Sequence, residues 1–176
     1  MKISYIRIQN FKSIRDLEIT ELENALILVG KNNTGKTNVI DAILAATGYH
    51  TVCTEEFLDP QKSIDITLSI EFTEEDLQSY QTRGMVSRHR DYEKWLEEFR
   101  SLIPSFQDNT VTFTFHINPE HKVRYNDGFQ KNNPYIREIF PKIYHIDQTR
   151  NLDTLQNDVF SFYDKESFEM LKDNTC

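Results

Sequence analysis

The chain has 176 residues, enough for one domain with its own hydrophobic core. Hydrophobic residues make up 38% of the sequence and charged residues 27%, which excludes a disordered chain. The formal net charge of −8 argues against a domain that binds nucleic acid strongly by itself, because such domains carry a basic surface. The two cysteines, Cys53 and Cys176, form no CxxC pair, which argues against a disulfide scaffold and a cysteine zinc site.

The N-terminus does not resemble a secretory signal, since charged residues interrupt the apolar ones within Met1–Arg7. No apolar run approaches the roughly 20 residues that a membrane-spanning helix needs. We therefore expect a cytoplasmic protein with no membrane partner.

The first third of the chain predicts three strands and one helix. Alternating apolar and polar residues predict strands at Ile3–Phe11 and Ile14–Leu22. Ala25–Val29 is apolar at every position, and such a run predicts a central strand buried on both faces. Lys36–Ala46 has its apolar residues on one stripe, which predicts an amphipathic helix.

The rest of the chain continues with strands and helices but without a regular βα repeat. Strict alternation predicts strands at Ile64–Phe72 and Val111–Ile117, and a turn at Asn118–Glu120 predicts a hairpin partner at His121–Tyr125. The other expected elements are a capping-box helix from Thr73 to about Tyr80, a helix at Asp91–Leu102 and a strand at Lys142–Ile146. The fold class is therefore mixed α/β or α+β with an antiparallel β subsheet.

The segment Gly30–Thr37 fits the phosphate-binding pattern G-x-x-x-x-G-K-[ST]. Gly30 and Gly35 permit a tight turn and a close approach of the backbone to phosphate, and the N–H groups between them form an anion nest. We expect Lys36 to meet the β- and γ-phosphates and Thr37 to offer its hydroxyl to Mg²⁺, at a helix N-terminus that attracts anions. The expected nucleotide-binding residues of this loop are Gly30, Lys31, Asn32, Asn33, Thr34, Gly35, Lys36 and Thr37.

The sequence around this loop adds a family resemblance. Its residues are Asn10-Phe11-Lys12-Ser13, the apolar run before the loop, and Asn38-Val39-Ile40-Asp41-Ala42-Ile43. They resemble the N-terminus of the SMC, RecF and double-strand-break-repair ATPases, and look most like the OLD (overcoming lysogenisation defect) ATPases. The resemblance implies a P-loop NTPase, specifically the N-terminal lobe of an ABC-type ATPase that binds ATP and Mg²⁺.

The resemblance also assigns residues outside the loop. It implies that Lys12, followed by Ser13, lies near the nucleotide together with Asn38. For Lys12 the alternative is a solvated lysine at the end of a strand. For Asp41 the favoured interpretation is a hydrogen bond that orients the helix. Polar residues of the following loop could form the Q-loop that contacts Mg²⁺ or water, although an ordinary polar loop is the favoured interpretation; these candidates are Glu55, Glu56, Asp59 and Gln61.

Other motifs of ABC-type ATPases are missing from the sequence. We find no LSGG-like signature, and the nearest approach to a Walker B strand, Ile143–Gln148, has Gln148 in the place of the general base. Gln148–Arg150 fits better the strand that precedes the middle insertion of OLD-like sequences. We expect residues 1–150 to form the ATP-binding lobe with the Walker A sequence, and residues 151–176 to form a tail that leads into a remainder.

Two functions follow as alternatives. In the first, a C-terminal half and homodimerisation complete an ATPase that drives a machine for DNA repair or anti-phage defence, with a nuclease or DNA as partner. In the second, the chain is a nucleotide-binding sensor or regulatory module that does not hydrolyse ATP. A P-loop GTPase would need an NKxD-type motif, which the sequence does not contain, and a P-loop kinase would need an arginine-bearing lid that Arg83–Arg90 only weakly imitates.

Overall fold

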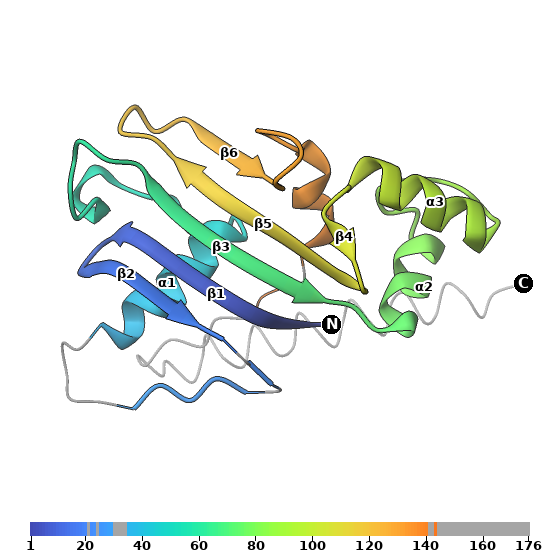
Figure 1. Cartoon of the computed structure of the whole chain (residues 1–176), viewed down its shortest axis with the longest axis horizontal. Helices are drawn as coiled ribbons and strands as arrows, with labels where there is room; N and C mark the ends of the chain where they lie inside the picture. The colour runs from blue at the N-terminus through green and yellow to red at the C-terminus, as the bar shows by residue number, and fades with distance from the viewer. Residues whose placement is uncertain (21, 24, 30–34, 141–142, 144–176) are drawn as a thin grey trace, which may run out of the picture. The chain divides into compact units, whose positions relative to one another are not determined.

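The computed structural model describes residues 1–20, 22–23, 25–29, 35–140 and 143. The chain divides into two compact units, Met1–Pro141 and Lys142–Cys176. Nearly all described residues belong to the first unit, which contains a sheet with helices on one face and at one end (Figure 1). This arrangement confirms the expected mixed α/β class with an antiparallel sheet.

The sheet of the described unit is antiparallel throughout, with the strand order β2-β1-β3-β5-β4 and with β6 also paired to β5. Its strands are β1 (Lys2–Phe11), β2 (Ile14–Ile19), β3 (Ile64–Glu71), β4 (Phe106–Gln107), β5 (Thr110–Ile117) and β6 (Val123–Asn126). The expected alternation fixes the register, because a slip of one residue would move every apolar side chain to the wrong face. Ile8, Ile66 and Phe115 are paired neighbours on the buried face.

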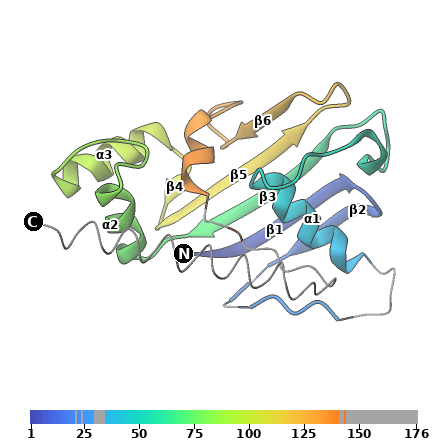
Figure 2. The ribbon, with the colours of Figure 1, turned by 180° about the vertical axis from the view of Figure 1, so that it is seen from behind.

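One helix and one 3₁₀ segment cover the apolar face of the sheet. The helix α1 (Lys36–Ala46) contacts β1 and β3 and buries Val39 and Ala42. The 3₁₀ segment η2 (Pro134–Ile139) lies on the same side, as Figure 2 shows. The buried side chains of α1 therefore hold this helix against β1 and β3.

Two further helices lie at one end of the sheet, next to β4 (Figure 1). They are α2 (Glu74–Thr82) and α3 (Tyr92–Leu102). The expected capping box at the start of α2 is present, since Thr73 and Asp76 exchange side-chain to backbone hydrogen bonds. Asp91 caps α3 by accepting a hydrogen bond from the backbone N–H of Lys94.

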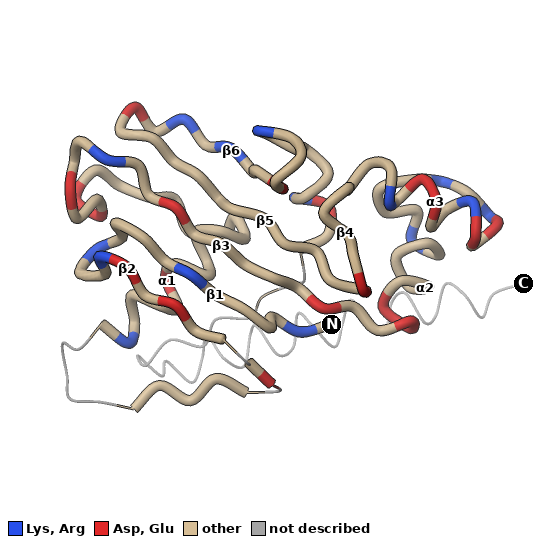
Figure 3. Tube along the Cα trace, viewed as in Figure 1, with Lys and Arg blue, Asp and Glu red and all other residues tan. Residues whose placement is uncertain are grey.

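The opposite face of the sheet is polar. Side chains that face each other across neighbouring strands are joined by hydrogen bonds, as in Thr67–Thr114 at 2.8 Å and His116–Asp65 at 2.7 Å. Figure 3 colours acidic and basic residues along the backbone, and residues of both signs occur within β2 and α3, whereas the charged residues of β1 are only Lys2 and Arg7.

The prediction of a buried central strand at Ala25–Val29 is wrong. This run has no regular secondary structure, and Ile27 and Val29 are 81% and 90% exposed. A strand buried on both faces needs a hydrogen-bonded neighbour on each side and cover above and below. The run follows β2, the edge strand of the sheet, and no strand of the described unit pairs with it.

The other predictions agree with the structure where it describes them. Strands, helices and the β5–β6 hairpin lie where the patterns place them, although β2 ends at Ile19 rather than Leu22. The sequence did not predict β4, η2 or the 3₁₀ turn η1 (Thr54–Glu56). The strand expected at Lys142–Ile146 and the tail expected at 151–176 lie outside the described residues, except for Ile143.

Candidate functional site

The helix α1 begins at the last two residues of the phosphate-binding pattern. Gly35 is the N-cap and has a φ of +87°, a left-handed conformation that favours glycine. Gly35 has no side chain with which to cap α1, and the first turn of the helix has no acidic residue, whereas the side chains of Thr73 and Asp91 cap α2 and α3. The backbone N–H groups at the start of α1 are therefore suited to an anion. Residues 30–34 of the loop lie outside the described residues.

The turn between β1 and β2 packs against this helix start. Asn38 donates a hydrogen bond from its side chain to Ser13 Oγ at 2.8 Å. A Cβ atom added to Gly35 would lie 3.4 Å from Ser13 Oγ, which is ordinary contact distance, so the positive φ is the reason for glycine there. Ser13 and Asn38, both expected at the nucleotide, are thus brought together beside Gly35.

Lys12 occupies the same turn in a left-handed conformation, with a φ of +51°. Its Nζ lies 2.6 Å from Asp41 Oδ2 on α1 and 3.1 Å from Glu56 Oε1. Burial lowers the pKa of Lys12, but the hydrogen bonds to Asp41 and Glu56 outweigh this effect and raise the pKa above its ordinary value. Lys12 is therefore not a solvated lysine, and Asp41 makes a hydrogen bond from α1 to Lys12, as the favoured interpretation expects.

Glu56 is held on both carboxylate oxygens. His50 Nε2 lies 2.8 Å from Oε1 and 2.9 Å from Oε2, and the backbone N–H of Cys53 donates to Oε2 at 2.8 Å. Burial would raise the pKa of Glu56, but the hydrogen bonds from Cys53, His50 and Lys12 lower it below the ordinary value. Since its lone pairs serve these groups, Glu56 is a structural carboxylate here rather than one that faces solvent.

The remaining Q-loop candidates do not approach α1 through any contact that the structure records. Asp59 accepts a hydrogen bond from the backbone N–H of Gln61 at 3.1 Å and pairs with Lys62 at 2.9 Å. Glu55 and Gln61 are exposed. These contacts are those of an ordinary polar loop, which was the favoured interpretation.

Sequence reasoning missed the role of Asn10 and His50. The Asn10 side chain donates to the backbone oxygens of Asp59, Lys62 and Ser63 at 3.0–3.2 Å, and accepts from the backbone N–H of Asp59 at 2.7 Å. It is 8% exposed, and its φ is +60°. An asparagine at the end of a strand is a recognised candidate for such a conformation, but nothing in the sequence gives its partners.

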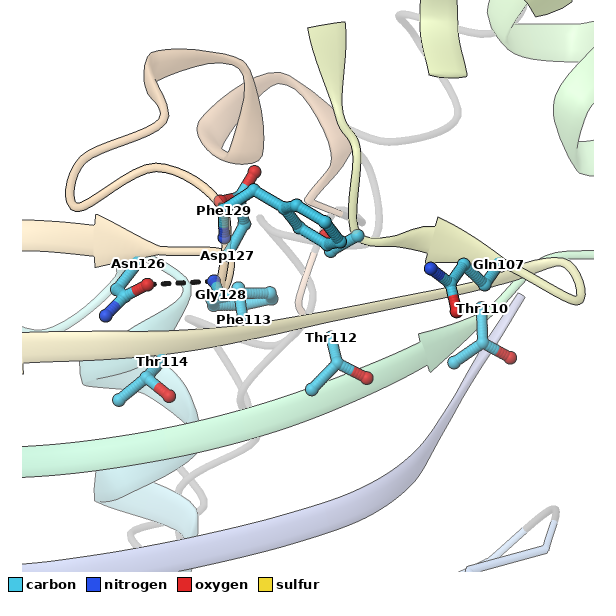
Figure 4. A pocket seen from close by; sticks show the side chains of 10 residues that line it. Gln107, Thr110, Thr112, Phe113, Thr114, Asn126, Asp127, Gly128 and Phe129 are labelled. Atoms are coloured by element: carbon cyan, nitrogen blue, oxygen red, sulfur yellow. Dashed lines mark hydrogen bonds between the residues drawn. The ribbon is translucent and has the colours of Figure 1, made fainter. Parts of the chain in front are cut away.

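A separate open pocket of about 480 Å³ lies along β5, far along the chain from the phosphate-binding pattern (Figure 4). Threonine hydroxyls, Asn126 and the ring of Phe129 line it, and Asp127 is its one ionisable lining residue. The carboxylate of Asp127 already accepts hydrogen bonds from the backbone of Phe129 and Gln130 and from Asn133. We therefore assign no chemistry to this pocket.

The helix α1 packs on an antiparallel sheet and begins after a left-handed glycine, which is the glycine of the GKT sequence. These features define a P-loop nucleoside triphosphatase. Residues 1–175 match the family model of the AAA ATPase domain, so the chain belongs to this family. The match confirms the expectation of an ATPase with a P-loop NTPase fold and, with it, a nucleotide-binding function.

Solved SMC heads are among the structures similar to this chain. An SMC ATPase from a study of ATP-driven dimerization and DNA-stimulated activation is 16% identical and has a TM-score of 0.46, with 71% of this chain and 68% of that chain covered. The Smc head bound to the C-winged helix domain of ScpA is 15% identical with a TM-score of 0.45, covering 71% and 35%. A Smc head with coiled coil and joint from Pyrococcus yayanosii is 16% identical with a TM-score of 0.45, covering 73% and 23%.

These values are too low to transfer detail from the SMC heads, and the chain spans only about a quarter to two thirds of their lengths. No curated protein matches the chain closely enough to count as a relative. In the part of the chain that the structure describes, no helix is long and apolar enough to cross a membrane.

Proposed function

We propose that the chain binds ATP with Mg²⁺ at Gly30–Thr37. The observation that carries this proposal is the start of α1. Its N-cap residue, Gly35, has a left-handed conformation and no side chain, and it directly precedes Lys36 and Thr37. Lys36 would meet the β- and γ-phosphates, and the Thr37 hydroxyl would hold Mg²⁺, which supplies positive charge to the phosphate oxygens. The backbone N–H groups of the first turn would complete the anion site.

We further propose that hydrolysis needs groups from a C-terminal half and a second copy of the protein. Phosphoryl transfer requires a group that orients the attacking water. Glu56 and Asp59 are occupied by neighbouring donors, so neither is suited to that task. The SMC ATPase noted above was studied for its ATP-driven dimerization. In our proposal this protein likewise forms a homodimer, and the second copy supplies groups that hydrolysis needs.

The machine that this ATPase would drive belongs, in our proposal, to OLD-like DNA repair or anti-phage defence in the cytoplasm, with DNA or a nuclease as partner. The opening residues carry the OLD-like resemblance. In this scheme residues 1–150 form the ATP-binding lobe and residues 151–176 connect it to the rest of the protein. The net charge of −8 and the interspersed charges in Figure 3 favour a DNA contact made elsewhere in the assembly.

The second candidate is a nucleotide-binding sensor that does not hydrolyse ATP. The favouring observation is that Glu56, the most buried of the loop carboxylates, serves Lys12, His50 and Cys53 rather than an open site. The two candidates share the nucleotide site and differ only in turnover.

Replacing Lys36 with alanine is expected to weaken binding of Mg-ATP by about 10- to 100-fold, because a charged hydrogen bond to phosphate is lost. Isothermal titration calorimetry on the whole chain measures this dissociation constant. The matched control is Lys131→Ala, which removes an exposed lysine outside the site. Undiminished ATP binding by Lys36→Ala would overturn the assignment of the phosphate-binding loop.

The purified 176-residue chain is expected to turn over ATP near the background rate. The physical reason is that Lys36 and Thr37 hold phosphate and Mg²⁺, while the group that orients water is supplied from outside these residues. Phosphate release is measured with and without a C-terminal half that carries Walker B and signature motifs. Steady multiple turnover of ATP by the chain alone, abolished in Lys36→Ala, would contradict the expected background rate. It would favour a hydrolytic site that is complete within these 176 residues.

A further inference from the structure

The Asn10–Ser13 turn, made of the last two residues of β1 and the two-residue connection to β2, joins two segments that are distant in sequence. On one side Lys12 pairs with Asp41, and Ser13 accepts a hydrogen bond from Asn38, both on α1. On the other side Lys12 pairs with Glu56, and its backbone N–H donates to the backbone oxygen of Glu56 at 2.6 Å. The Asn10–Ser13 turn therefore contacts the N-terminal half of α1 on one side and the segment 50–63 on the other.

The charges in this contact are only partly exposed. The side chains of Lys12, Asp41 and Glu56 are 26%, 19% and 13% exposed. Two carboxylates surround one ammonium, and His50 adds a donor to Glu56. Removing the ammonium would take the ion pair from Asp41 and one of three donors from Glu56, in a place where water solvates these carboxylates poorly.

We infer that Lys12 is a positioning residue, which Asp41 and Glu56 hold in place so that the Asn10–Ser13 turn fixes the start of α1 for phosphate binding. This inference rests on the proposed nucleotide site, and it revises the expectation that Lys12 itself lies at the nucleotide. For its ammonium to move to a phosphate, Asp41 and Glu56 would have to give up their shared partner. The desolvation of two carboxylates opposes that movement.

A double-mutant cycle tests the inference. Lys12→Met removes the ammonium and keeps the length of the side chain, and Glu56→Gln removes the carboxylate charge. We expect each single change to weaken Mg-ATP binding roughly 3- to 30-fold, and the double variant to bind no more weakly than the weaker single variant, because both changes break one network. Lys62→Met is the matched control, since Lys62 pairs with Asp59 on the surface and is 74% exposed.

A direct phosphate contact of Lys12 predicts a different result. Glu56→Gln would then leave ATP binding unchanged or strengthen it. The effects of the two single changes on ATP affinity would also not saturate in the double variant. The salt dependence of binding would also become shallower in Lys12→Met, because a charge that meets phosphate has been removed. Either observation would overturn the positioning role, whereas an unchanged salt dependence together with saturation in the double variant supports it.

A nucleotide-free measurement separates failure of this inference from failure of the proposed function. Hydrogen exchange of the amides of Lys12 and Leu58, which donate to the backbone oxygens of Glu56 and Asn10, is expected to become faster in Glu56→Gln than in Lys62→Met. If the wild-type chain binds no nucleotide but this exchange changes, the proposed function fails and the positioning contact stands. If nucleotide binds and neither exchange nor affinity responds to Glu56→Gln, the inference is overturned while the proposed function stands.

Discussion

Replacing Trp95 with alanine is expected to lower the free energy of unfolding by about 3–5 kcal/mol. Trp95 on α3 is 0% exposed, and its ring centroid lies 5.0 Å from that of Phe99 and 6.0 Å from that of Tyr92. Truncation removes these contacts and leaves a cavity that a covered core cannot refill. Chemical denaturation followed by circular dichroism measures the change.

The indole also ties the α2–α3 connection to the core. Its Nε1 donates to the backbone oxygen of Met85 at 3.1 Å, next to Val86, whose φ of +63° is unusual for a β-branched residue. Losing the indole N–H should therefore also weaken the attachment of the α2–α3 connection to the core. Lys94→Ala, one position away and exposed, is the control and should change stability by less than about 0.5 kcal/mol. A loss below about 1 kcal/mol for Trp95→Ala would show that α3 does not belong to the cooperative core.

Replacing Asn10 with alanine is expected to lower the free energy of unfolding by about 2–4 kcal/mol, because three backbone oxygens and one N–H of the segment 59–63 lose their partner. It should also weaken Mg-ATP binding, since Asn10 is the second-last residue of β1 and lies two positions before Lys12. Denaturation and calorimetry on the same preparations measure both effects.

The Asn10→Gly variant separates the two contributions to this loss. Glycine accepts the φ of +60° without strain, whereas alanine does not, so Asn10→Gly should be less destabilising than Asn10→Ala by about 1 kcal/mol. The loss of unfolding free energy that remains in Asn10→Gly is due chiefly to the lost side-chain hydrogen bonds. Equal stability of Asn10→Gly and the wild type would mean that these hydrogen bonds contribute nothing.

Local pattern was sufficient for much of the fold. The alternation in Ile64–Phe72 predicts β3 because a sheet with one covered face must separate apolar from polar side chains along each strand. The helix at Lys36–Ala46 and the cap at Thr73 were predicted to the residue or nearly so, because periodicity and capping involve groups within one or two turns. The GKT sequence predicts the helix start and its glycine in the same local manner.

The partners of the polar residues could not be predicted from the sequence. Lys12, Asp41 and Glu56 come from three segments, and only the packing of α1 on the sheet beside the β1–β2 turn brings them together. The same limit explains the error at Ala25–Val29. Apolar composition shows that a run favours burial, but whether it forms a central strand depends on strands that pair with it from elsewhere.

The sequence by itself therefore determined the class of the protein, through the phosphate-binding pattern and the strand and helix periods, because those depend on neighbouring residues. The tertiary structure decided which charges meet and which apolar run is covered. Long-range ion pairs and strand pairings depend on how the elements pack in space, and sequence spacing does not encode that directly. This is why Lys12, which the family resemblance places near the nucleotide, is found between two carboxylates in the folded protein.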